Sequence, residues 1–215
     1  MNIMTWNEQL QIGVAHIAQH DARLAAIIEM HPQPTFRPHT DYYHELVSSI
    51  ISQQLSVKAA ATIYTRFVDS FGHVPEPAEI LSRDDTELRA VGLSGQKTRY
   101  IKDLAEKVMS GEVRFDHLDK LSNEVIVAEL TSVKGVGEWT VHMFLMSCMG
   151  RFDVLPTGDL GIKNAVFNLY SLETLPTPAD ITRIADENGW KPYESIASWY
   201  LWQSLNNSEN LSESI

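Results

Sequence analysis

Cysteine is almost absent from the sequence, because Cys148 is the only one in 215 residues. A single cysteine excludes a disulfide within the chain, a four-cysteine iron–sulfur cluster and a cysteine-rich zinc site. The eight histidines have neither HExxH nor two-cysteine, two-histidine spacing, so we predict no catalytic metal. Long apolar runs are missing too, and residues 1–16 lack the basic start and apolar segment of a signal peptide. We therefore expect a soluble cytoplasmic protein without a membrane partner.

Basic residues are scarce relative to acidic ones, with 17 Lys and Arg against 28 Asp and Glu and a net charge of −11. This balance argues against a nucleic-acid partner, which normally requires a basic surface. The acidic excess lies outside residues 89–163, where ten basic and ten acidic residues balance, so this middle segment is compatible with DNA. Four of its cations are equally explained as the solvated face of one helix: Lys97, Arg99, Lys102 and Lys107.

Sustained alternation of polar and apolar residues is also missing, and so is any repeat of about twenty to fifty residues. Apolar residues recur at helical spacing instead, which predicts an all-α protein of about ten helices. One helix is predicted over residues 7–29, another after Asp41 as its cap, and a last one over residues 192–205. Pro75 and Pro77 are interpreted as a connector.

No long linker separates the two ends of the chain from its centre. We therefore predict one domain, residues 1–215, made of two interlocked helical lobes with a ligand-binding cleft between them. The central lobe is expected over about residues 40–150 and contains the glycine hairpin described next. The second lobe combines residues 1–39 with residues 151–215.

A short loop with two glycines, Gly135 and Gly137, precedes a helix that we expect to start near Glu138. Glycine is used where φ is positive or where the backbone must approach a ligand closely. Backbone N–H groups and the positive end of a helix attract phosphate, so Val133–Gly137 is a candidate phosphate-binding hairpin, and Lys134 adds charge. An ordinary helix–turn–helix connection explains a lone GxG pattern equally well.

Four motifs follow one another along the chain: QQLS, GLSGQK, LTSVKGVGEWT and DVLPTGDLGIK. Their order resembles the helix-hairpin-helix DNA glycosylase superfamily, and within it the 3-methyladenine DNA glycosylase II, or alkyladenine, branch. The resemblance covers roughly residues 40–205 and depends on the combination of motifs. It implies the glycosylase fold in a compact form, without the N-terminal α/β domain of larger members.

The resemblance identifies Asp159 as the catalytic aspartate. Cleavage of an N-glycosidic bond builds positive charge on the sugar, which a fixed carboxylate stabilises while it aligns or deprotonates a water molecule. Asp153 is the rival carboxylate. Asp159 also stands where it can cap the helix LGIKNAVFNLY, and this structural role is either an alternative to catalysis or compatible with it.

Related glycosylases that also nick the DNA backbone carry a lysine two residues after the last hairpin glycine, where it forms a Schiff base. Trp139 occupies that position here. We therefore predict a monofunctional enzyme that leaves an abasic site.

A base within a duplex must be flipped out, and a wedge residue must fill the gap. The break at ISQQLS supplies the wedge in the family, and we predict Gln54 first and Leu55 second. In the alternative interpretation, Leu55 belongs to the core and Gln54 is a solvated cap. The walls of the base pocket are predicted to be Trp139 above all, then Trp202, Trp199, Tyr43 and Met143. An alkylated base is cationic, and an indole face gains about 0.5–2 kcal/mol from cation–π attraction.

The predicted function is thus excision of alkylated purines, 3-methyladenine and 7-methylguanine, from double-stranded DNA in base excision repair. We expect a monomer without a cofactor, associated with the nucleoid in a bacterium or nuclear in a eukaryote. A structural Na⁺ or K⁺ on the backbone carbonyls of Thr131, Val133 and Val136 is implied by the resemblance. The alternative is a non-catalytic helix-hairpin-helix module that binds DNA or damaged DNA, which would not require Asp159.

Overall fold

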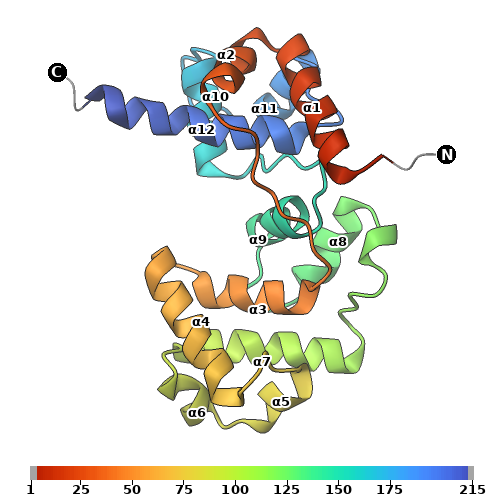
Figure 1. Cartoon of the computed structure of the whole chain (residues 1–215), viewed down its shortest axis with the longest axis vertical. Helices are drawn as coiled ribbons and strands as arrows, with labels where there is room; N and C mark the ends of the chain where they lie inside the picture. Colours follow the sequence, from red (N-terminus) through yellow and green to blue (C-terminus); the bar gives the residue numbers. More distant parts are fainter. Residues whose placement is uncertain (1–3, 213–215) are drawn as a thin grey trace. The chain divides into compact units, whose positions relative to one another are not determined.

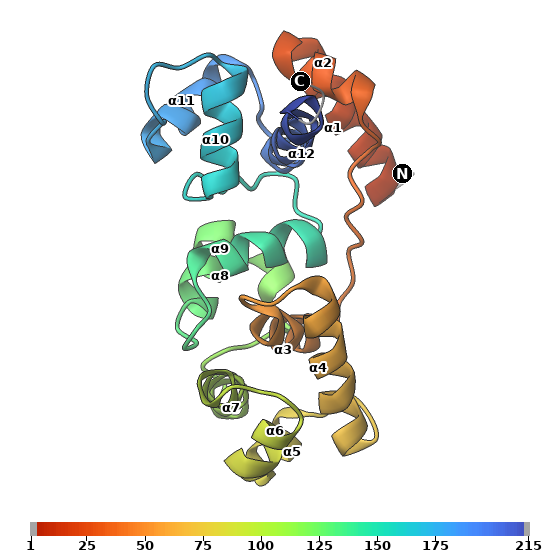
Figure 2. The same cartoon turned by 90° about the vertical axis from the view of Figure 1, so that its left-hand side faces the viewer.

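The computed structural model describes residues 4–212, with side chains to residue 205, and the figures show the path of the chain (Figures 1 and 2). These residues contain α-helices, one 3₁₀ turn and one π turn but no strand, which confirms the all-α prediction. None of their helices has the length and apolar composition of a membrane span. The chain divides into two compact units, one with both ends, Met1–Pro38 and Leu145–Ile215, and one with the centre, His39–Phe144.

The central unit consists of seven α-helices in the described chain. They are α3 (Tyr42–Ser52), α4 (Val57–Phe71), α5 (Pro77–Ser82), α6 (Asp85–Ala90), α7 (Gly95–Ser110), α8 (Asn123–Leu130) and α9 (Glu138–Met143). The long helix α7 packs against α3, α5 and α6, and α8 packs against α9 (Figure 2). Sequence signals set several ends, because Ser56 caps α4, Ser94 caps α7, and Gly72 ends α4 in the left-handed conformation.

The terminal unit is built around the last helix of the chain. Its helices are α1 (Trp6–His20), α2 (Ala22–Met30), α10 (Leu160–Leu169), α11 (Pro178–Glu187) and α12 (Glu194–Ser212). The helix α12 packs against α1, α2 and α10, and the core at this junction contains the fully buried rings of Trp190 and Tyr200. Cys148 is buried in the π turn Phe144–Cys148 that follows α9.

The prediction of one helix over residues 7–29 is wrong, because the chain breaks at Asp21 into α1 and α2. The Asp21 carboxylate is buried. One of its oxygens accepts hydrogen bonds from the backbone N–H groups of Arg23 and Leu24, 3.0 and 3.1 Å away. The other accepts from the indole of Trp190 at 2.8 Å and from the hydroxyl of Tyr170. Four donors on one buried carboxylate outweigh the helical pattern around it.

Two further boundaries differ from the prediction. The connector marked by Pro75 and Pro77 includes α5, in which Pro77 is the first helical residue, a position where its missing N–H has no cost. The last helix runs from Glu194 to Ser212 and so extends beyond residue 205.

Candidate functional site

The glycine hairpin lies between α8 and α9, as predicted. Val133 and Val136 are buried, whereas the residues between and after them are exposed. Gly135 has φ of 80°, and an added Cβ would lie 2.0 Å from the Tyr100 ring, so only glycine fits there. Gly137 has φ of −94° and no atom within 4 Å of an added Cβ. Nothing within the described chain requires glycine at this second position, which leaves the backbone open to a close approach from outside.

Two side chains from other segments hold the hairpin in place. The buried carboxylate of Asp103 on α7 accepts a hydrogen bond from the backbone N–H of Lys134 and pairs with its Nζ, both at 2.8 Å. Burial raises the pKa of Asp103, but the hydrogen bonds and charge of Lys134 outweigh it and leave that pKa below its usual value. Gln53 donates from Nε2 to the Gly135 carbonyl at 2.7 Å. The hairpin is therefore preformed, and part of the Lys134 charge is neutralised.

The turn after α3 carries both wedge candidates. Gln54 is exposed and has φ of 56°, a left-handed conformation that is uncommon for residues other than glycine. Leu55 is 37% exposed and lines a pocket of about 410 Å³ beside Val57 and Tyr64. The alternative in which Leu55 belongs to the core is therefore wrong. Both side chains are accessible to a ligand.

The base-pocket candidates of the central unit differ in their exposure. Trp139, in the first turn of α9, is 54% exposed. Tyr43 is buried, its hydroxyl has no hydrogen-bond partner in the described chain, and burial raises its pKa, with a smaller contribution from Glu76. Met143 is half-buried. Trp139 is therefore the most exposed of these three residues.

Asp159 in the terminal unit is fixed by two N–H donors that converge on Oδ1. The backbone N–H of Ile162 donates at 2.7 Å, so Asp159 does cap α10, and the indole Nε1 of Trp202 on α12 donates at 3.0 Å. Trp199 instead packs in the core against Tyr200 and is 9% exposed. Of the two predicted tryptophans on α12, the structure thus brings Trp202 to Asp159. The rival carboxylate, Asp153, is exposed and lies near Glu194.

Several residues with a part in this arrangement were missed in the sequence. Gln53 and Asp103 hold the hairpin through long-range contacts that no local pattern reveals. A signal for Asp103 did exist, since it stands between the buried residues Ile101 and Leu104 on an apolar helix face. Gly161, where an added Cβ would lie 3.0 Å from Oδ1 of Asp159, was missed as well, although a glycine inside the helix predicted after Asp159 was a signal.

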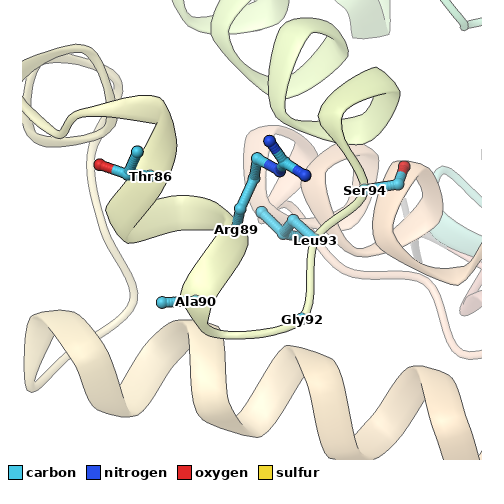
Figure 3. Close-up of a pocket in the computed structure, with 6 residues that line it drawn as sticks. All are labelled: Thr86, Arg89, Ala90, Gly92, Leu93 and Ser94. Atoms are coloured by element: carbon cyan, nitrogen blue, oxygen red, sulfur yellow. The ribbon is translucent and has the colours of Figure 1, made fainter.

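A separate pocket of about 490 Å³ lies at the turn between α6 and α7 (Figure 3). Its lining residues are Thr86, Arg89, Ala90, Gly92, Leu93 and Ser94. None of them belongs to the predicted site, and Arg89 is the one charged residue among them. We assign this pocket no role.

The chain is similar to known proteins over most of its length. Residues 47–191 match the family model described as HhH-GPD superfamily base excision DNA repair protein. DNA-3-methyladenine glycosylase 1 of Schizosaccharomyces pombe is 32% identical, over 94% of this chain and 89% of that protein. A crystal structure of a DNA-3-methyladenine glycosidase from Bacillus halodurans has a TM-score of 0.77 and 35% identity, covering 89% of this chain and 88% of that one. The 3-methyladenine DNA glycosylase Mag1 of S. pombe, in complex with abasic DNA, has a TM-score of 0.70 and 33% identity, covering 89% and 95%.

Proposed function

Since the chain belongs to the HhH-GPD superfamily of base excision DNA repair proteins, we propose that it is a monofunctional DNA glycosylase of the 3-methyladenine type. Its substrates are alkylated purines, 3-methyladenine and 7-methylguanine, in double-stranded DNA, and it acts as a monomer without a catalytic cofactor. The observation that carries the proposal is the carboxylate of Asp159, held by two N–H donors at the start of α10.

The reaction breaks the bond between C1′ of the sugar and the base nitrogen, and the electron pair leaves with the base. Positive charge develops on the sugar, and the carboxylate of Asp159 stabilises it without having to reorganise. A water molecule then adds its oxygen to C1′, and its proton passes to Asp159 or to the departing base. An alkylated purine already carries positive charge and is a good leaving group, so one fixed carboxylate suffices for the chemistry.

The exposed ring of Trp139 serves as the main wall for the flipped base, and its electron-rich face favours a cationic base over a neutral one by about 0.5–2 kcal/mol. Trp202 adds a second aromatic surface next to Asp159. Trp199 and Tyr43, also predicted as walls, are buried in their own units, and Met143 is half-buried, so each leaves little surface for a base. Selectivity for alkylated bases then comes from this attraction together with the weakened glycosidic bond.

The hairpin Val133–Gly137 binds the DNA backbone through N–H groups, and Gln54 or Leu55 fills the gap left by the flipped base. A Na⁺ or K⁺ ion fits the hairpin, because backbone carbonyls are suitable ligands for such hard cations. Among the backbone hydrogen bonds of turns and loops in the described chain, none is accepted by the carbonyl of Thr131 or Val136. The Val133 carbonyl accepts one from the Val136 N–H at 3.1 Å and keeps its second lone pair. When bound, the ion would supply positive charge that attracts phosphate.

Release of free base from methylated duplex DNA tests this function. We expect release by the wild-type protein, none by Asp159→Asn, and nearly unchanged release by Asp153→Asn, which alters the neighbouring exposed carboxylate. Equal activity of the wild type and Asp159→Asn would refute the catalytic assignment. Salt-sensitive binding of DNA without base release by any of the three proteins would favour the non-catalytic module instead.

A further inference from the structure

The first turn of α10 contains a glycine, Gly161, in a helical position where alanine would be more favourable by about 0.5–1 kcal/mol. Its backbone is not in the left-handed region, so its conformation does not require glycine. Its neighbours do. An added Cβ would lie 3.0 Å from Oδ1 of Asp159, 3.0 Å from Cδ1 of Trp202 and 3.2 Å from Nε1 of Trp202. A methyl group here would therefore crowd the hydrogen bond between Trp202 and Asp159, because it would touch the acceptor Oδ1, the donor Nε1 and the ring carbon next to that donor.

We propose that Trp202 is a positioning residue that orients the carboxylate of Asp159 through its indole N–H, and that Gly161 is the residue that makes room for this contact. The inference rests on the proposed function, in which Asp159 performs the chemistry. It gives Trp202 a role that its ring surface alone would not fulfil.

The capping hydrogen bond from the Ile162 N–H does not by itself fix the orientation of the Asp159 carboxylate, because the carboxylate can still rotate about that bond. The second donor comes from another helix. Trp202 is partly buried against the hydrophobic core, and α12, which carries it, packs against α10. The direction of the Asp159 carboxylate is thus set by the packing of two helices, which limits the loss of rate that misplacement of a reacting group causes.

The contribution of the N–H can be separated from that of the ring. Replacing Trp202 by 3-benzothienylalanine keeps the shape of the bicyclic ring and substitutes sulfur for the N–H group. Gly161→Ala keeps the indole and pushes it away from Oδ1. Gly95→Ala is the matched control, since Gly95 also stands in the first turn of a helix but has only the end of the Arg99 side chain near an added Cβ, at 3.8 Å.

Single-turnover base release and thermal unfolding should be measured for each protein. We expect release to slow by roughly 10- to 100-fold in both the benzothienylalanine protein and Gly161→Ala, with binding of an uncleavable abasic duplex and thermal stability nearly unchanged. Gly95→Ala should release base at the wild-type rate. A wild-type rate in the benzothienylalanine protein would overturn the positioning role and leave Trp202 as a pocket wall.

Hydrogen exchange of the Trp202 indole, followed by nitrogen-15 NMR, provides a measurement that does not depend on activity. We expect slow exchange in the wild type and faster exchange in Gly161→Ala. Exchange in the wild type as fast as in an unstructured peptide would overturn the inference even if base release is robust. A protected indole in a wild-type protein that releases no base would instead remove the proposed function, and the positioning role with it.

Discussion

The side-chain amide of Gln53 donates a hydrogen bond to the carbonyl oxygen of Gly135, with 2.7 Å between the two atoms. This bond joins the turn after α3, which carries the wedge candidates, to the hairpin proposed to bind the DNA backbone. Both segments lie in the unit His39–Phe144, so their relative placement belongs to its fold. The wedge candidates and the proposed backbone contact therefore lie on one preorganised part of this unit, which DNA would not have to order on binding.

Removing this connection should weaken DNA binding. We expect Gln53→Ala to bind an abasic duplex about 3- to 10-fold less tightly, because one net hydrogen bond is lost and the turn must be ordered on binding. Fluorescence anisotropy at fixed salt measures the effect. Gln33→Ala is the control, since its amide pairs with that of Gln11 in the other unit. Equal affinities of Gln53→Ala and the wild type would contradict the prediction.

The two hairpin glycines should respond differently to alanine. Gly137→Ala fits the free protein and should change the free energy of unfolding by no more than about 1 kcal/mol. Its methyl group would keep a phosphate away from the backbone, so we expect duplex affinity to fall by about tenfold or more. Gly135→Ala should instead destabilise the protein, because it meets the ring of Tyr100 in a left-handed conformation. Melting curves and anisotropy distinguish the two effects, and unchanged affinity in Gly137→Ala would exclude the hairpin as a backbone contact.

The fold could be predicted where local signals act alone. The helix expected after Asp41 begins at Tyr42, and the helix expected near Glu138 begins at that residue, each after a residue that marks its start in the sequence. The break at Asp21 was missed because Trp190, one of its partners, is 169 residues away. A helical pattern gives no information about a buried carboxylate that depends on such distant donors.

The site shows the same division. The cap at Asp159 was visible from the sequence, and Trp202 and then Trp199 were predicted as pocket walls, but no pattern showed which of them lies beside Asp159. The two residues stand three apart on α12, about 60° apart around the helix axis. Because of this angle, one ring faces the hydrophobic core and the other faces the Asp159 carboxylate. The packing of α12 against α10 decides that Trp199 takes the first position and Trp202 the second.

The protein should not form a Schiff base with DNA. Trp139 replaces the lysine expected of a lyase, and the hydrogen bond and charge of Asp103 raise the pKa of Lys134, which keeps this nearby amine protonated and poorly nucleophilic. We expect borohydride to trap no covalent adduct on methylated duplex DNA, and the abasic product to be cleaved only by alkali. A denaturing gel shows both results. An adduct that forms in the wild type and disappears in Lys134→Met would refute the monofunctional mechanism and identify the nucleophile.

Glu194 should make the stability of the protein depend on pH. Its carboxyl is buried, and its Oε2 has no hydrogen-bond partner in the described chain. Burial raises the pKa of Glu194, and the nearby negative charge of Asp153 adds to this shift. A carboxyl whose folded pKa lies above its unfolded value binds its proton more tightly in the folded state, so the penalty appears as pH rises above about 4.3 and grows until the folded pKa is passed.

Replacing this carboxyl by an amide removes the charge and keeps the shape. We therefore expect Glu194→Gln to raise the melting temperature by about 2–4 °C at pH 7–8, and the difference from the wild type to shrink towards zero as the pH falls to about 4. Glu173→Gln, which alters an exposed carboxylate of the same unit, should show no such trend. Melting curves over this pH range decide the matter. A lower melting temperature of Glu194→Gln at neutral pH, or a difference that is constant with pH, would mean that the ionised Glu194 is stabilised by its surroundings after all.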